Sequence, residues 1–180
     1  INVTPAMVKA MLGPEKVKPT FISRTDAVGI ANGLAWTSVG GEMLPIEVSI
    51  IPNGSGKVEI TGSLGDVMKE SAHLALTYAR VHAETYHIAP DKFKNTDIHI
   101  HAPEGAVPKD GPSAGVTLTT ALISALSEIP VRHDLAMTGE ITLHGNVLPI
   151  GGLKEKSMAA FREGISTVLI PEANKPDLYE

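Results

Sequence analysis

The sequence predicts an α+β fold with mixed sheets, a three-stranded N-terminal β meander and flanking helices. Two observations lead to this fold class. First, β-type runs and runs with helical apolar spacing alternate along most of the 180-residue chain, as they do where helices pack on sheets. Second, glycine-rich turns at 40–41 and 53–56 separate three consecutive β-type runs between residues 28 and 61. Strands joined by short turns pair antiparallel, so a mixed sheet is expected.

The first element in chain order is a short helix over residues 4–12. Thr4 before Pro5 is a typical helix start, and Gly13 followed by Pro14 is a typical end. The stretch from there to residue 25 carries scattered charges and a second proline, and it is expected to be a linker. The chain therefore divides into a connector, 1–25, and a folded domain, 26–180.

The remaining elements follow the meander. Ser63 and Asp66 resemble a capping box ahead of a helix, whose apolar residues recur at 68, 72, 75, 76 and 79. Residues 97–103 alternate like a half-buried strand, and a helix is expected to begin near Ser113. Beyond it the sequence predicts β structure over 135–150, a helix over 151–164 ended by Gly164, a strand over 166–171 and the start of another helix.

The composition is that of a globular domain, and it argues against several classes of function. Net charge is −5 and no lysine/arginine run stands out, which argues against a nucleic-acid partner. The chain has no cysteine, which excludes disulfides, thiolate nucleophiles and cysteine-ligated zinc. No stretch approaches the roughly 18 apolar residues of a membrane span, and no signal-like leader is visible. We expect a soluble intracellular protein.

The segment "VPKDGPSAGVTL" (107–118) raises the question of what Ser113 does. Gly111 and Gly115 let the backbone approach a ligand, and the N–H groups of a helix start favour negative charge. An acyl-transfer enzyme needs such a place for its oxyanion. The plainer interpretation is that Ser113 only caps the helix. No G-x-S-x-G nucleophile elbow is present.

A serine nucleophile needs a base, and the sequence offers two kinds. Seven histidines allow a Ser-His-Asp triad by count. A buried lysine is the other choice, because desolvation favours its neutral form. Lys154 and Lys156 lie in the predicted helix 151–164, and Lys156 shares a face with Leu153 and Ala160. Spacing therefore favours Lys156 without deciding it, and two solvated lysines remain the plainer interpretation.

Three other features suggest functions that their context does not support. The GSGK stretch (54–57) precedes a β run rather than a helix, so a turn is expected and not a phosphate-binding loop. His99 and His101 share a strand face but have no third ligand at recognisable spacing, so packing or hydrogen bonding is the simpler role. Trp36 is expected to pack in the core or, less simply, to line a substrate groove.

Several motifs together resemble the proteolytic domain of the ATP-dependent Lon proteases. They are "GLAWTSVGGEMLPIEVS" (33–49), "TGSLGDVMKESA" (61–72), "DIHIHAPEGAVPKDGPSAG" (97–115), "MTGEITLHGNVLPIGGLKEK" (137–156) and "TVLIP" (167–171). These motifs are spread from residue 33 to residue 171, so the resemblance extends over nearly the whole chain. The resemblance implies the Lon proteolytic-domain fold, of the ribosomal protein S5 domain 2-like type. It also implies a serine endopeptidase in which Ser113 is the nucleophile and Lys156 the base.

The resemblance assigns supporting roles as well. Thr138 matches a hydroxyl that orients the lysine, and Asp110 and Glu140 match acidic positions near the site. Backbone groups at Gly111, Pro112 and Ser113 are expected to form the oxyanion hole. No metal and no cofactor are expected in this chain, because ATP and magnesium belong to the ATPase module of the intact family enzyme.

The family also implies an organisation for the rest of the protein. The connector would leave an ATPase module that is missing here, and the domain 26–180 would be truncated at its C-terminus. Expected partners are unfolded or damaged polypeptides and copies of the same chain in a hexameric ring, with no membrane and no nucleic acid. Bacterial cytoplasm is the expected compartment, with the mitochondrial matrix as the alternative. His144 stands where bacterial relatives usually carry arginine.

The sequence also allows two alternatives to a serine endopeptidase. The first is a non-catalytic assembly module that keeps the fold without a competent site. The joint presence of Ser113, Lys156 and Thr138 argues against it. The second is a metal-dependent hydrolase built on His99 and His101, which would lose its activity with a chelator.

Overall fold

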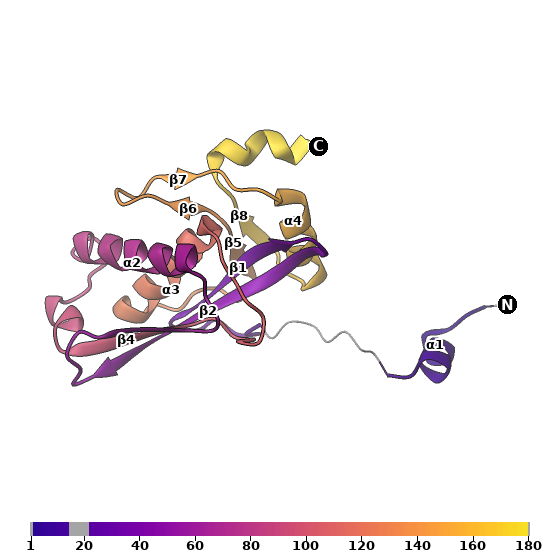
Figure 1. The fold of residues 1–180 in the computed structure, drawn as a ribbon, viewed down its shortest axis with the longest axis horizontal. Helices are drawn as coiled ribbons and strands as arrows, with labels where there is room; N and C mark the ends of the chain where they lie inside the picture. The colour runs from indigo at the N-terminus through magenta and orange to yellow at the C-terminus, as the bar shows by residue number, and fades with distance from the viewer. Residues whose placement is uncertain (1, 15–21, 180) are drawn as a thin grey trace.

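The computed structural model describes residues 2–14 and 22–179, and its centre is a six-stranded mixed sheet (Figure 1). The strand order is β3-β4-β2-β1-β5-β8. The strands are β1 (Ile30–Thr37), β2 (Gly40–Pro52), β3 (Val58–Thr61), β4 (Thr96–His101), β5 (Leu135–Met137) and β8 (Thr167–Leu169). A second, two-stranded sheet pairs β6 (Glu140–Ile141) with β7 (Val147–Leu148). The predicted α+β class with mixed sheets is confirmed.

Four α-helices and three 3₁₀ segments accompany these strands in the described part of the chain. The α-helices are α1 (Pro5–Leu12), α2 (Asp66–Val81), α3 (Gly115–Ser127) and α4 (Leu153–Arg162). The 3₁₀ segments are η1 (Pro90–Phe93), η2 (Pro112–Ala114) and η3 (Glu172–Tyr179). The helical start expected at the C-terminal end is η3, which is a 3₁₀ rather than an α segment. No helix within residues 2–14 and 22–179 is long and apolar enough to cross a membrane.

The N-terminal helix forms as the sequence predicts. The Thr4 hydroxyl accepts a hydrogen bond from the N–H of Met7, Pro5 occupies the first turn, and Gly13 ends α1 at φ +81°. None of the residues of α1 is buried. The expected linker includes residues 15–21, which lie outside the described residues.

The expected three-stranded meander is wrong in its third strand. β1 and β2 do pair antiparallel, but β4 lies between β2 and β3, and β3 runs parallel to β4. The turn at 53–57 is fastened to β4, because the carboxylate of Asp97 accepts the N–H groups of Ser55 and Lys57, both at 2.8 Å. Ile98 and Ile100 of β4 are buried. A central position gives β4 two neighbouring strands, which short-range turn signals do not register.

Alternation along the strands sends side chains to two cores on opposite faces of the sheet. Ala31 of β1 and Ile46 of β2 belong to the larger core, under α2 and α3. Leu34 of β1 and Met43 of β2 belong to the smaller core, which Ala160 of α4 joins from the other face. Two helix layers thus hold β1 and β2 between them (Figure 1).

Candidate active site

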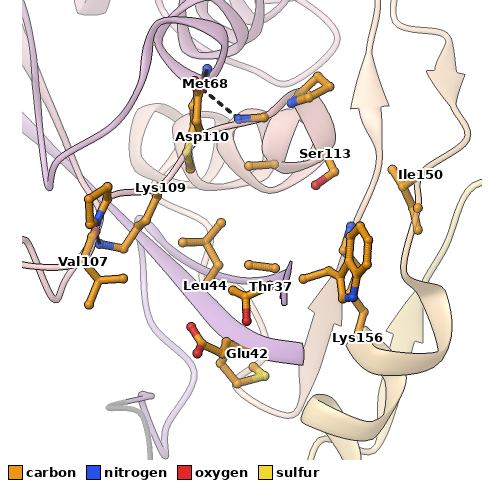
Figure 2. Close-up of a pocket in the computed structure, with 18 of the residues that line it drawn as sticks. Thr37, Glu42, Leu44, Met68, Val107, Lys109, Asp110, Ser113, Ile150 and Lys156 are labelled. Atoms are coloured by element: carbon orange, nitrogen blue, oxygen red, sulfur yellow. Dashed lines mark hydrogen bonds between the residues drawn. The ribbon is translucent and has the colours of Figure 1, made fainter. Parts of the chain in front are cut away.

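A cleft of about 400 Å³ opens between the β1–β2 hairpin, the loop after β4, η2 and the start of α4 (Figure 2). Ser113 and Lys156 both line it, and so do Asp110 and Glu140. Thr138 is buried and contacts Lys156. The fold therefore gathers residues that the sequence spreads over 110–156.

Ser113 lies in η2, in the single turn that precedes α3. Its carbonyl accepts the N–H of Gly139 at 2.9 Å, while its half-buried side chain lines the cleft. The helix-capping interpretation is wrong: neither η2 nor α3 has a side-chain cap hydrogen bond, and α3 begins only at Gly115. The inserted 3₁₀ turn moves Ser113 away from the cap position, so its hydroxyl is not used as a cap.

Lys156 is the buried lysine of α4. Only 2% of it is exposed, and Leu153 and Ala160 on the same face are buried too. Lys154 is exposed, so the lysine that the helical spacing favoured is the buried one. Burial lowers the pKa of Lys156 to about 8, because desolvation disfavours the ammonium form. About a tenth of this lysine is therefore an uncharged amine at pH 7, able to accept a proton, whereas at the ordinary lysine pKa less than about 0.1% would be.

Thr138 links the two halves of the site. Its hydroxyl accepts a hydrogen bond from Lys156 Nζ at 3.1 Å and donates to the carbonyl of Ser113 at 3.5 Å. Thr138 is 2% exposed, and its own N–H is bonded to Leu169 of β8. A hydroxyl fixed in this way holds the lysine amine in one direction. The MTGE segment thus fastens the backbone of Ser113 and the amine of Lys156 to the same strand end.

Asp110 is turned away from the lysine and towards α2. Its carboxylate accepts the N–H of Met68 at 2.9 Å and that of Gly111 at 2.8 Å. The pKa of Asp110 is lowered by these hydrogen bonds and by the N–H of Val67, and the N–H of Gly111 has the largest effect. The N-terminus of α2 is thus capped from the Ser113 loop, and the capping box expected from Ser63 and Asp66 does not form, since the α2 cap residue is Gly65.

The three residues expected to form the oxyanion hole differ in whether their backbone has an N–H group free to donate. Pro112 carries no N–H and cannot donate, so its place in the predicted hole is wrong. The N–H of Gly111, at φ +115°, is already bonded to the carboxylate of Asp110. Of the three residues, Ser113 is left as the candidate donor to an oxyanion.

Comparison with known proteins adds an independent observation. Residues 2–180 match the family model described as the Lon protease (S16) C-terminal proteolytic domain. The chain belongs to the Lon protease family. It is 57% identical to the Lon protease of Geobacter metallireducens over 179 residues and to Lon protease 1 of Myxococcus xanthus over 180 residues. It is 53% identical to the Lon protease of Clostridium acetobutylicum over 178 residues.

These alignments cover 99% to 100% of the chain but only 22% to 23% of each relative. The chain thus spans about a fifth of the length of the Lon proteases it matches. The resemblance that the sequence motifs indicate is confirmed, and the chain corresponds to the proteolytic domain of the family.

The two histidines of β4 lie outside the cleft of this Lon domain. His99 Nε2 and His101 Nδ1 both contact the hydroxyl of Thr61, at 2.9 and 2.7 Å. They are therefore hydrogen-bonded side chains on the sheet face. Within the described residues, no group of three or more histidine and acidic side chains is placed to hold a metal ion.

Trp36 packs at the cleft mouth and explains a glycine of the Lon motif GGLKEK. Trp36 is 59% exposed and lines the cleft, so the core role expected for it is wrong. Gly152 precedes α4 at φ +68°, and a Cβ there would lie 2.6 Å from Cγ of Trp36. Both the backbone conformation and the space admit only glycine at this position. The start of α4, and with it Lys156, is seated on the β1–β2 hairpin.

Sequence reasoning missed Asn174, a buried residue of η3. Its side-chain amide accepts the N–H of Ile150 at 2.9 Å and donates to the carbonyl of Ile150 at 2.8 Å. Ile150 lines the cleft, so Asn174 fixes that wall through its backbone. An asparagine ahead of a proline in "EANKP" carries no distinctive signal, because asparagine is common in any turn.

Proposed function

We propose that this domain hydrolyses peptide bonds with a serine–lysine dyad, in which Ser113 is the nucleophile and Lys156 the general base. The observation that supports it best is the burial of Lys156 in the wall of the cleft that Ser113 also lines. A lysine whose pKa is lowered to about 8 by burial can take a proton from a serine hydroxyl near neutral pH.

The chemistry proceeds in two halves. Ser113 Oγ attacks the scissile carbonyl carbon while Lys156 Nζ takes the hydroxyl proton, and Lys156 then returns that proton to the departing amine. Water attacks the resulting ester with Lys156 again accepting the proton, and the acid product leaves as Ser113 is reprotonated. Thr138 positions the lysine throughout, and the N–H of Ser113 supports the oxyanion. Asp110 and Glu140 act as supporting residues, Asp110 by fastening the loop.

A second part of the proposal concerns the intact protein to which this domain belongs. We propose that it is an ATP-dependent Lon protease that degrades unfolded or damaged polypeptides for protein quality control. Residues 1–25 would connect an ATPase module, which uses ATP and magnesium, to the proteolytic domain 26–180, and copies would assemble in a hexameric ring. The relatives named Lon protease support the protease part of this proposal, and their bacterial sources favour bacterial cytoplasm over the mitochondrial matrix.

The test is cleavage of a fluorogenic, unstructured peptide by the chain, without ATP and with or without a chelator. Ser113→Ala and Lys156→Ala are expected to abolish cleavage, while the exposed Lys154→Ala, in the same helix, retains it. Cleavage that persists in Ser113→Ala would overturn the proposal. Loss of cleavage with the chelator would favour the metal-dependent alternative.

A further inference from the structure

The cleft contains a second lysine whose contacts the proposed reaction does not use. Lys109 Nζ donates hydrogen bonds to three backbone carbonyls: those of Glu104 at 2.8 Å, Val107 at 2.9 Å and Gly62 at 3.2 Å. An ammonium group has three N–H donors, so all of them are used. Lys109 is half-buried and lines the cleft (Figure 2).

These three carbonyls belong to two separate segments. Glu104 and Val107 lie in the loop that leaves β4, while Gly62 directly follows β3. The backbone of Lys109 joins the same segments, since its N–H donates to Ser63 and its carbonyl accepts from Gly65. The ammonium therefore closes the loop on itself and fixes the closed loop to the end of β3.

This loop forms one wall of the cleft. Pro103, Glu104, Val107 and Pro108 all line it, although Val107 is 46% exposed and Glu104 and Pro108 are exposed. A loop with so little buried side-chain surface has little hydrophobic stabilisation of its own. Hydrogen bonds to a charged donor are worth more than neutral ones, and here three of them converge on one group.

We propose that Lys109 is a positioning residue, which holds the 103–108 wall of the cleft in the conformation that receives the substrate peptide. This inference rests on the proposed function of the cleft and extends it to a residue that does not take part in the chemistry. Without the ammonium the wall samples other conformations, and a substrate must then select the competent one. Apparent affinity falls in proportion to the competent fraction.

The first experiment compares Lys109→Met with the wild type in the full chain. Methionine keeps an unbranched stem and removes the charge. We expect KM for the fluorogenic peptide to rise about tenfold, because roughly a tenth of the molecules would hold the competent wall, while kcat changes less than about threefold. Lys94→Met serves as the matched control, since Lys94 is exposed and its side chain forms no hydrogen bond with the described residues.

Two further measurements separate positioning from chemistry and from folding. A small phosphonofluoridate, which needs Ser113 but not the wall, should label Lys109→Met within about threefold of the wild-type rate. Amide hydrogen exchange over 103–108 should be faster in Lys109→Met and unchanged in Lys94→Met. The exchange result does not depend on catalysis, so it still tests the inference on Lys109 if the wild type cleaves nothing.

A rescue keeps the test independent of the methionine variant. The chain has no cysteine, so Lys109→Cys introduces its single thiol, and aminoethylation in denaturant followed by refolding restores an ammonium at nearly the same reach. The aminoethylated protein should recover the wild-type KM and slow exchange. Unchanged KM and exchange in Lys109→Met would overturn the proposal, and so would a parallel loss of kcat and of phosphonofluoridate labelling.

Discussion

Lys109 and Lys156 border the same cleft, but their surroundings give them different chemistry. Burial lowers the pKa of Lys109 as well, but Glu104 and Glu42 oppose that shift. Its three N–H groups are directed to backbone carbonyls. Lys156 donates a single hydrogen bond, to Thr138, and is 2% exposed. Burial is the only cause of its lowered pKa, so the carboxylates of the cleft do not counteract it. One lysine is therefore suited to hold a loop and the other to accept a proton.

The pH dependence of cleavage follows from Lys156. The active form is the neutral amine, so kcat/KM should rise with pH, with a midpoint near the pKa of about 8. The rise should be about tenfold per pH unit well below the midpoint, and a plateau should follow above it. Initial rates on an uncharged peptide between pH 6 and 10 provide the measurement. A profile that stays flat or falls through this range would contradict the role of Lys156.

Thr138 should matter through its hydroxyl alone. Thr138→Val keeps the shape but removes the acceptor for Lys156 Nζ and the donor to Ser113. We expect kcat to fall by roughly tenfold to a hundredfold, at or below the lower end of what general-base catalysis contributes, because Lys156 is still present but no longer oriented. Thr138→Ser keeps the hydroxyl and should retain most of the activity. Equal kcat values for the two variants would show that the hydroxyl does not orient the lysine.

At the scale of elements, the cleft depends on contacts that join segments distant in sequence. η2 carries Ser113 and is fastened by the N–H of Gly139, just beyond β5. The start of α4 rests on the β1–β2 hairpin, where Arg162 also donates to the carbonyl of Gly41 at 2.9 Å. The N-terminus of α2 is capped by Asp110. Each element of the site is therefore fixed by contacts with other elements of the fold.

Asn174 provides the element-scale prediction. Asn174→Ala would remove both hydrogen bonds to Ile150 and leave an N–H and a carbonyl without these partners. We expect the free energy of unfolding to fall by about 1–3 kcal/mol, since two partly buried hydrogen bonds are lost and each contributes about 0.5–1.5 kcal/mol. Urea unfolding of this variant and of the exposed control Asn95→Ala tests it. A loss of stability of the same size in both variants would contradict the role of Asn174.

At the scale of the whole molecule, the buried lysine makes stability depend on pH. The folded pKa of about 8 lies below the ordinary value of 10.5, so the unfolded chain binds more protons between these values. Stability should therefore rise with pH from about 8 to 10.5 and stop rising above that. The gap corresponds to about 3 kcal/mol at most, at 1.36 kcal/mol for each pKa unit.

Lys156→Met tests this dependence, because methionine of similar length carries no charge. It should be more stable than the wild type at pH 7 and should lose most of the rise between pH 8 and 10.5. Urea unfolding at pH 7.5 and 9.5 measures both effects. A variant that is less stable at pH 7.5, or that keeps the wild-type slope, would show that burial of Lys156 carries no such cost.

The sequence by itself determined the fold class, and it predicted Ser113 and Lys156, which line the same cleft, as the dyad. Apolar spacing predicted the helix that became α2, and the motifs around Ser113 and Lys156 indicated the Lon family. These signals are local, because helical and strand periods repeat within a few residues and a motif is read in one stretch.

Tertiary structure alone decided three other matters. β4 entered between β2 and β3 because a strand's neighbours depend on burial across the whole sheet. Ser113 does not cap α3. Asp110, and not the expected Ser63 and Asp66, caps α2, because hydrogen-bond partners depend on distance in space and not on distance along the chain. Lys109 and Asn174 acquired their roles from backbone carbonyls and N–H groups, which every residue carries. No sequence pattern distinguishes such partners, so only the folded chain brings them together.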